Sequence, residues 1–313
     1  MEARDRSVAF FGPAGTFTEE ALLTQADLAA ATLVPKSMIE DVLFAVASGE
    51  VDCGFIPLEN AIEGTVNSTL DGLVFDVDLR IVREVVMDIH LHLMAPAGTS
   101  LKDVRAVLSF PHALSQCRRF LAATLPDAAV VAAQSTADAA RQLGASRDAA
   151  TAAIAPRLAA SLYGLELLCE RIEDYPDNQT RFVLVARSGV PAPSGHDRTS
   201  IVCFQGDDRP GSLYGILGQF AARSINLTKL ESRPAKTGLG TYCFVIEFDG
   251  HVADEVVGNC LTELRASVAE VKFLGSYSTA GDGAEARREA FASRRDVART
   301  WVDALLAEEQ VWG

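Results

Sequence analysis

The stretch DVLFAVASGEVDCGFIPLEN, residues 41–60, reads as a helix, a turn and a buried strand in immediate succession. Its last part is a short, continuously apolar run, which is typical of a strand that is covered on both faces. Short strands of this kind that alternate with helices predict parallel-rich sheets packed between helices. This stretch therefore favours an α/β fold.

The same alternation continues on both sides of this stretch, over residues 7–187. SVAFFG near the N-terminus is a short apolar strand, and a helix is expected from about Phe17. Thr16 and Glu19 have the spacing of a capping box, in which each residue satisfies a free amide at the start of a helix. Further strand–helix pairs are expected at VRAVLS with ALSQCRRFLAAT, DAAVVAAQ with STADAARQLG, and AAIA with PRLAASLYG.

The pattern changes after a segment rich in Pro, Gly and Ser, which predicts a linker at 188–198. Residues 199–277 show strand, helix, two strands, helix and strand, the βαββαβ order of ferredoxin-like domains. Residues 281–313 are charged and rich in alanine, and they predict one amphipathic helix that packs on a neighbour. Its apolar positions are Val297, Trp301 and Leu305.

Composition narrows the classes of function. The chain has 313 residues and a net charge of −14, which argues against nucleic acid as a partner. No apolar run reaches the ~18 residues of a membrane span, and the N-terminus has no apolar signal core, so we expect a cytoplasmic protein. The six cysteines show no CxxC spacing and are expected to be reduced core thiols. Apart from a pair of alternating histidines, His90 and His92, nothing suggests a metal, and none is expected.

Polar residues gather where the predicted strands end, in GPAGTFTEE, PLENAIEG, SFPHALSQC and DNQTRF. Ligands of α/β sheets bind at the carboxyl ends of strands, so these four segments predict one cleft. Their hydroxyl and amide donors suit an anionic ligand, and His112 is an alternative general base. The residues alone leave open an enzyme or a solute sensor. The candidates from these segments are Thr16, Glu59, Asn60, Ser109, Gln116, Thr180 and Arg181.

Within DNQTRF, Thr180 and Phe182 share one face of a regular strand and Arg181 points to the other. The charge of Arg181 requires a partner in a buried place. Two interpretations remain open: Arg181 pairs with Asp174 or Asp177, or it holds a carboxylate of a ligand.

The four segments, in this order, resemble prephenate dehydratase, and GSLYGIL with INLTKLESRP resembles the ACT regulatory domain of that family. The resemblance covers residues 7 to about 277. It implies a catalytic domain over 7–187 with a type II periplasmic-binding-protein fold. One lobe would contain about 7–80 with 165–187, and the other about 81–164. Residues 199–277 would form the ACT domain.

The resemblance also implies a reaction, the conversion of prephenate to phenylpyruvate, water and CO2 in phenylalanine synthesis. Loss of CO2 expels the ring hydroxyl and makes the ring aromatic, so no cofactor is expected. Thr180 would donate a hydrogen bond to the departing hydroxyl, with Glu59 as a neighbour that relays a proton. The substrate would be held by Thr16, Asn60, Ser109, Gln116, Arg181 and Phe182.

The ACT resemblance implies inhibition by L-phenylalanine. It also implies either a homotetramer built as a dimer of dimers or a homodimer. The effector site would consist of Gly211, Ser212, Leu213, Asn226, Leu227, Thr228, Glu231, Ser232, Arg233 and Pro234. Two positions depart from the family pattern, since Ala61 and Ser212 stand where a serine and an alanine are usual. Two alternatives remain: arogenate as the substrate, and a non-catalytic sensor of an amino acid or organic anion.

Overall fold

The computed structural model describes residues 6–205, 209–236, 241–280, 297 and 300–305 of the chain. The chain divides into two compact units, Met1–Gly189 and Val190–Gly313. The division falls inside the segment 188–198, where composition predicts a linker. The first unit has two sheets and the second unit has one, and each unit has an apolar core of its own.

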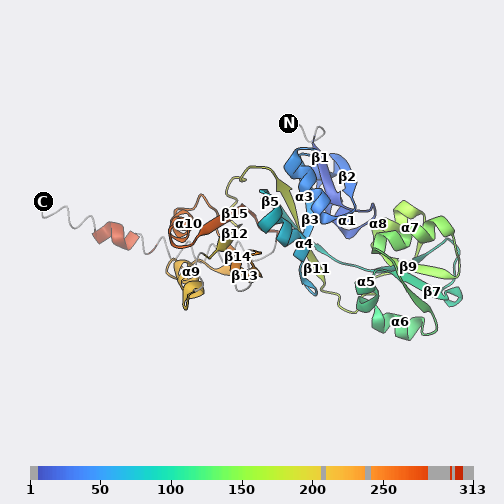
Figure 1. The fold of residues 1–313 in the computed structure, drawn as a ribbon. Helices are drawn as coiled ribbons and strands as arrows, with labels where there is room; N and C mark the ends of the chain where they lie inside the picture. Colours follow the sequence, from blue (N-terminus) through green and yellow to red (C-terminus); the bar gives the residue numbers. More distant parts are fainter. Residues whose placement is uncertain (1–5, 206–208, 237–240, 281–296, 298–299, 306–313) are drawn as a thin grey trace, which may run out of the picture. The chain divides into compact units, whose positions relative to one another are not determined.

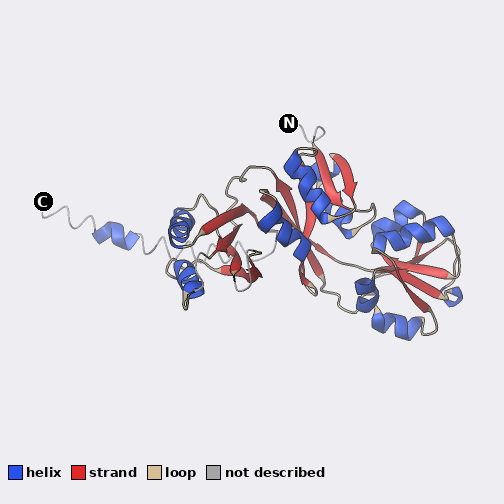
Figure 2. Cartoon of the chain, in the orientation of Figure 1, coloured by secondary structure: helices blue, strands red, loops and turns tan. Residues whose placement is uncertain are grey.

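The first unit contains two sheets, each accompanied by helices (Figure 1, Figure 2). Each sheet with its helices is called a lobe below, and the lobe that contains β1 is the first. The first sheet has the order β2-β1-β3-β11-β5, with the short β4 beside β3. β1 is parallel to β2 and β3, whereas β11 runs antiparallel to β3 and β5. Its strands are β1 (Ser7–Phe11), β2 (Thr32–Lys36), β3 (Cys53–Asn60), β4 (Gly64–Thr65), β5 (Arg80–Asp88) and β11 (Gln179–Ala186). Its helices are α1 (Phe17–Leu23), α2 (Ala26–Ala29), α3 (Ile39–Ser48), α4 (Asn67–Asp71) and the π-helical turn η2 (Gly72–Asp76).

The helix, turn and strand predicted at residues 41–60 are present as α3 and β3. Gly49 ends α3 in the left-handed conformation, with φ 82°, which favours glycine. A Cβ atom on Gly54 in β3 would lie 2.8 Å from Val42 and 2.9 Å from Val46 of α3. The missing side chain thus allows α3 to pack directly on the backbone of β3 and sets the position of the strand that ends at Asn60.

The second sheet has the order β10-β6-β9-β7-β8. β7 is parallel to β8 and β9, and β6 is antiparallel to β9 and β10, so both sheets are mixed rather than purely parallel. Its strands are β6 (His92–Ala95), β7 (Ala106–Ser109), β8 (Ala129–Ala132), β9 (Thr151–Ala155) and β10 (Glu166–Cys169). The helices are η3 (Leu101–Asp103), α5 (Pro111–Gln116), α6 (Arg118–Thr124), α7 (Thr136–Ser146) and α8 (Arg157–Tyr163).

The chain passes between the two sheets twice, after β5 and after β10. The lobe boundaries expected near residues 80 and 165 are therefore wrong, because β5 pairs with β11 in the first sheet and β10 with β6 in the second. The order of elements along the chain does not say which sheet a strand joins. Backbone hydrogen bonds join the two crossing segments, from Ile89 N to Asn178 O at 2.8 Å and from Ile172 N to Leu91 O at 2.9 Å.

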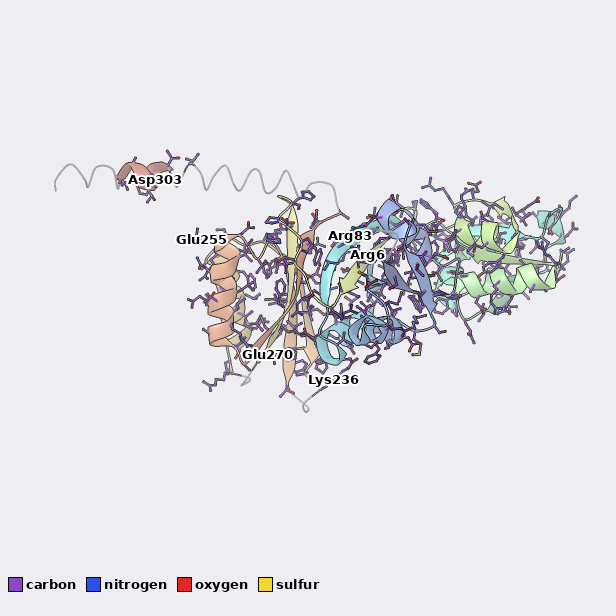
Figure 3. All side chains as sticks on the ribbon, turned by 90° about the horizontal axis from the view of Figure 1, so that it is seen from above. Arg6, Arg83, Lys236, Glu255, Glu270 and Asp303 are labelled. Atoms are coloured by element: carbon purple, nitrogen blue, oxygen red, sulfur yellow. The ribbon has the colours of Figure 1, made fainter. Side chains whose placement is uncertain are left out.

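The second unit contains one antiparallel sheet of the order β13-β14-β12-β15. The elements follow one another as βαββαβ, as predicted. They are β12 (Asp197–Phe204), α9 (Ser212–Ala221), β13 (Leu227–Pro234), β14 (Tyr242–Asp249), α10 (Glu255–Ser267) and β15 (Glu270–Ser278). In Figure 3, which labels Glu255 at the start of α10 and Glu270 at the start of β15, α10 runs alongside the sheet. Phe220 of α9 packs on Phe248 of β14 in the core between helices and sheet.

The amphipathic helix predicted over 281–313 lies mostly outside the described residues. Positions 297 and 300–305 are helical, and the side chains of Val297, Trp301 and Leu305 are exposed. Packing of these side chains on a neighbour stays a prediction. In the part of the chain that the structure describes, no helix is both long and apolar enough to cross a membrane.

Candidate functional site

Thr180 and Asn60 oppose each other at the ends of two neighbouring strands, β11 and β3. Their Cα atoms are register partners, as are those of Arg181 and Glu59. Residues that oppose each other in antiparallel strands share a face, so Thr180 and Asn60 lie on one face and the other pair on the opposite one. Asn60 Nδ2 donates to Thr180 Oγ1 at 2.8 Å. The prediction that Thr180 and Arg181 point to opposite faces is confirmed.

Arg181 is held between two glutamates. Its Nη2 lies 3.1 Å from Glu59 Oε2, and its Nη1 lies 3.2 Å from Glu84 Oε2 on β5. The Arg181 side chain is only 10% exposed, so the carboxylates offset the cost of burying its charge. The predicted pairing of Arg181 with Asp174 or Asp177 is wrong. The carboxylates come from the neighbouring strands and not from the preceding loop.

The position of Glu59 contradicts its expected role as a proton relay. Its side chain shares the face of Arg181, whereas Thr180 points to the other face of the same sheet. The Arg181 guanidinium is likewise bound to carboxylates on the face away from Thr180. The structure therefore removes Glu59 from the neighbourhood of the Thr180 hydroxyl and gives Arg181 a structural place within the sheet.

Phe182 lies in the apolar core of the first lobe. It is 1% exposed, and its ring stacks on Phe55 with 5.6 Å between ring centroids. The expectation that this ring forms a wall of the substrate site is corrected, because core side chains cover it. Phe182 does share the face of Thr180. Thr180 lies at the end of the strand beside Asn60, whereas Phe182, two residues further along, is already covered by the core.

Replacing Phe182 by alanine is expected to destabilise the first unit by about 3–5 kcal/mol, because the change opens a cavity beside Phe55. Loss of helical circular dichroism in urea would measure this. Phe44→Ala on α3 is the matched control, since Phe44 is 52% exposed in the same lobe, and its effect should stay within about 0.5 kcal/mol. Equal effects of the two substitutions would contradict a core role for Phe182.

Ser109 at the end of β7 is also buried. Its side chain is 0% exposed, and its hydroxyl donates to Ile154 O of β9 at 2.6 Å. The expectation that Ser109 binds substrate is corrected accordingly, since its hydroxyl joins two strands of the second sheet. Helix α5 begins two residues later, at Pro111.

Helix α5 carries two side chains of the second lobe to the loop that follows β3. Gln116 Nε2 donates to Glu63 Oε1 at 3.3 Å, and His112 Nδ1 lies 3.0 Å from Glu63 Oε2. Gln116 Oε1 accepts from Asn178 Nδ2 at 3.2 Å, and Asn178 Oδ1 accepts from Asn60 Nδ2 at 2.9 Å. Gln116, Asn60 and Thr180 are thus brought together by contacts that cross from one lobe to the other. His112, the alternative general base, is bound to a carboxylate.

Thr16 caps α1, as the sequence predicts. Its Oγ1 accepts from Glu19 N at 3.3 Å and donates to Phe11 O at 3.2 Å. The reciprocal bond of Glu19 goes to Gly15 N at 2.5 Å instead of Thr16 N. The loop before α1 is bonded to the second lobe through the Tyr163 hydroxyl, which donates to Ala14 O at 2.6 Å.

Ionisable groups respond to burial around the junction of the lobes. Burial raises the pKa of Glu20, while the backbone amide of Leu158 and the charge of Arg157 act in the opposite direction. Burial lowers the pKa of His92, which therefore favours its neutral form. Burial also raises the pKa of the Cys117 thiol, so this cysteine beside Gln116 is not an activated nucleophile.

Comparison with known proteins identifies the family. Residues 8–189 match the family model described as prephenate dehydratase. The chain belongs to the prephenate dehydratase family. A prephenate dehydratase of Mycolicibacterium vanbaalenii is 42% identical over 286 residues, which cover 87% of this chain and 91% of the relative. The chain is accordingly a lyase with a mixed α/β fold.

Solved structures extend the likeness beyond residues 8–189. A prephenate dehydratase of Arthrobacter aurescens, solved in complex with L-Phe, is 39% identical and has a TM-score of 0.81, with 96% of this chain and 99% of that chain covered. A protein described as a quorum quenching acylase, GqqA, is 27% identical with a TM-score of 0.80, over 88% of this chain and 98% of that one. Proteins of different description therefore share this fold.

The residues that the prephenate dehydratase resemblance assigns to an effector site divide between several environments of the second unit. Gly211 precedes α9 with φ 89°, and the Ser212 hydroxyl donates to Arg209 O at 2.8 Å. Asn226 Nδ2 donates to Asp249 Oδ2 at 2.9 Å. Leu213 and Leu227 pack against the core.

Strand β13 carries the remaining effector candidates on both of its faces. Glu231 lies between two cations, 3.3 Å from Arg233 and 3.6 Å from Lys229. Side chains alternate along a strand, so the exposed Ser232 points away from Glu231. Thr228 and Pro234 are exposed as well. The candidates on β13 thus do not all share one face of the strand.

Two residues of the site were missed from the sequence, Glu63 and Asn178. Both stand inside the quoted motifs, Glu63 in PLENAIEG and Asn178 in DNQTRF. The prediction was based on residues at the ends of strands, whereas these two residues lie in the adjoining loops. Their importance arises from contacts with residues 53 and 62 positions away in the chain.

Proposed function

We propose that the chain converts prephenate to phenylpyruvate, water and CO2, with Thr180 as the donor to the departing hydroxyl. The observation that carries this proposal is the hydrogen bond from Asn60 Nδ2 to Thr180 Oγ1. Asn60 Oδ1 accepts from the backbone amides of Ile62 and Glu63 at 2.9 and 3.0 Å, so the amide can present only its NH2 group to Thr180. The threonine oxygen is then an acceptor, and its hydrogen is left for another partner.

This orientation suits the chemistry of prephenate. As CO2 leaves, its bonding electron pair moves through the ring and expels the hydroxyl at the opposite end, which takes up a proton to become water. A threonine hydroxyl does not ionise near pH 7, so it acts as a donor aimed at the charge that develops on the leaving oxygen. In this proposal Asn60 orients Thr180, which revises its expected role as a substrate ligand. Gln116 supplies an amide from the second lobe.

The test is an assay of the purified chain with prephenate, in which phenylpyruvate is followed by its absorbance in alkali. Turnover to phenylpyruvate is expected. Binding of prephenate without product would favour the non-catalytic sensor. Arogenate is assayed in parallel, with phenylalanine as the product, and a higher kcat/KM for arogenate would replace the proposed substrate with its aminated relative.

We also propose that residues 7–187 form a two-lobed catalytic domain of the type II periplasmic-binding-protein kind, and that residues 199–277 form an ACT domain. Two sheets joined by two crossings and the βαββαβ order of the second unit support these assignments. L-phenylalanine is the proposed effector, supported by the similarity to a dehydratase solved with L-Phe. The homotetramer or homodimer and the cytoplasmic location stay predictions.

Ser232→Ala and Asn226→Ala are expected to weaken inhibition by L-phenylalanine and to leave turnover without the effector unchanged. Ser232 is exposed on β13, and Asn226 precedes it at the start of the strand. Inhibition curves with L-phenylalanine would measure the shift. Thr262→Ala in α10 is the matched control, because Thr262 is exposed and its hydroxyl donates within the helix, to Gly258 O. Unchanged inhibition in both variants would place the effector elsewhere.

A further inference from the structure

Four polar residues at the junction of the lobes close a ring of hydrogen bonds, through side chains and one backbone amide. Asn60 Nδ2 donates to Asn178 Oδ1 at 2.9 Å, and Asn178 Nδ2 donates to Gln116 Oε1 at 3.2 Å. Gln116 Nε2 donates to Glu63 Oε1 at 3.3 Å. Glu63 N completes the ring by donating to Asn60 Oδ1 at 3.0 Å. Each of the three amides therefore donates through one end and accepts through the other.

The direction of this ring is determined where Glu63 enters it. A backbone N–H can only donate, so Asn60 must turn its oxygen toward Glu63 N and its NH2 group toward Asn178. A carboxylate can only accept, so Gln116 must turn its NH2 group toward Glu63. Both constraints give Asn178 the same orientation, with its oxygen toward Asn60 and its nitrogen toward Gln116.

Asn178 is placed to transmit this orientation. It is 2% exposed, and its backbone carbonyl accepts from Ile89 N, which lies in the other crossing segment. Its side chain contacts Asn60 from the first lobe and Gln116 from the second. A buried amide with both ends bonded is costly to turn. Turning that of Asn178 would place its NH2 group against the NH2 group of Asn60 and its oxygen against Gln116 Oε1.

We propose that Asn178 is a positioning residue that holds the Asn60 and Gln116 amides in the directions that Glu63 gives them, and through Asn60 holds the direction of the Thr180 hydroxyl. The proposal rests on the proposed function, because it assigns Asn178 to the same reaction. Asn178 has no need to touch the substrate in this role. It keeps the NH2 group of Asn60 on Thr180 Oγ1 and keeps the amide of Gln116 in one orientation when the lobes are together.

The test is Asn178→Asp, which preserves size but turns one donor into an acceptor. At pH 8 the introduced carboxylate repels Gln116 Oε1, and kcat/KM is expected to fall roughly 10- to 100-fold, as for a buried group left without its partner. Burial raises the pKa of such a carboxyl. As the pH falls through that pKa, the neutral acid donates to Gln116 again, so the activity of the variant relative to wild type should recover.

Two variants control this experiment. Asn178→Ala lacks both ends of the amide, and its activity relative to wild type is expected to be low at every pH. Asn259→Asp adds the same charge on an exposed position of α10, and its relative activity is expected to stay near one throughout. Thermal unfolding of each variant at both ends of the pH range shows whether the loss at pH 8 accompanies unfolding.

A second readout does not depend on turnover. In ¹H–¹⁵N spectra, the side-chain amide signals of Asn60 and Gln116 should shift in Asn178→Asp at pH 8 and return toward their wild-type positions at low pH. A ratio of activities that is flat with pH in a folded variant, or unmoved amide signals, would overturn the proposal. Wild-type protein without turnover, but with amide signals that shift as expected, would refute the proposed function and leave the ring and its direction standing.

Discussion

Replacing Thr180 by alanine is expected to lower kcat by about 10²–10⁴-fold with little change in KM, because a positioned donor to the leaving group acts mainly in the transition state. The fold should survive the change. Asn60 Nδ2 retains Asn178 Oδ1 and Gln179 O, at 2.9 and 3.2 Å, as acceptors. The rate of phenylpyruvate formation at saturating prephenate would measure the loss.

Thr180→Ser is the matched control for this variant. It keeps the hydroxyl and its bond from Asn60 and removes only a methyl group, so kcat should stay within about tenfold of wild type. If serine lost as much as alanine, the methyl group and its packing would explain the effect instead of the hydroxyl. A loss carried by KM in both variants would make Thr180 a binding residue.

Replacing Asn60 by aspartate is expected to lower kcat by about 100-fold or more, the loss typical when a donor to the charge of the transition state is removed. The Oδ1 bonds to the amides of Ile62 and Glu63 are kept. The other oxygen now faces Thr180 Oγ1 as an acceptor, so the threonine hydrogen turns toward the carboxylate and away from the substrate. The kcat at saturating prephenate, with a thermal melt to show folding, would measure this.

Asn60→Ala separates orientation from simple loss of a contact. Alanine leaves the Thr180 hydroxyl free to rotate, so it still points at the substrate part of the time. We therefore expect kcat to decrease from wild type to alanine to aspartate. The reverse order, with alanine the slowest, would mean that Asn60 contributes through the turn it caps and not through Thr180.

The sequence predicted the structure well where the local pattern of apolar and polar residues decides it. Residues 41–60 form the predicted helix and strand, and the second unit has the predicted βαββαβ order. Alternation along β11 also placed Thr180 and Arg181 on opposite faces before any partner was known. These features depend on residues that are close in sequence, so a single chain is enough to predict them.

The sequence was a poor guide where a residue's partner comes from far along the chain. Arg181 meets Glu84 and Glu59, which are 97 and 122 positions away, and not the acids of the preceding loop. Phe182 lies within β11 and Ser109 ends β7, and packing around them buries both. The lobe boundaries differ from the prediction because pairing with β11 and β6 decides which sheets contain β5 and β10. No local sequence pattern reveals such pairing.

By itself the sequence determined the α/β class, the second unit's order of elements and a set of polar residues at strand ends. Only the tertiary structure decided which of those residues meet. Asn60, Asn178, Gln116 and Glu63 close one ring because two crossings bring β3, β11 and α5 together. The direction of a hydrogen bond depends on both partners at once, so the orientation of Thr180 follows from contacts in space and not from any one motif.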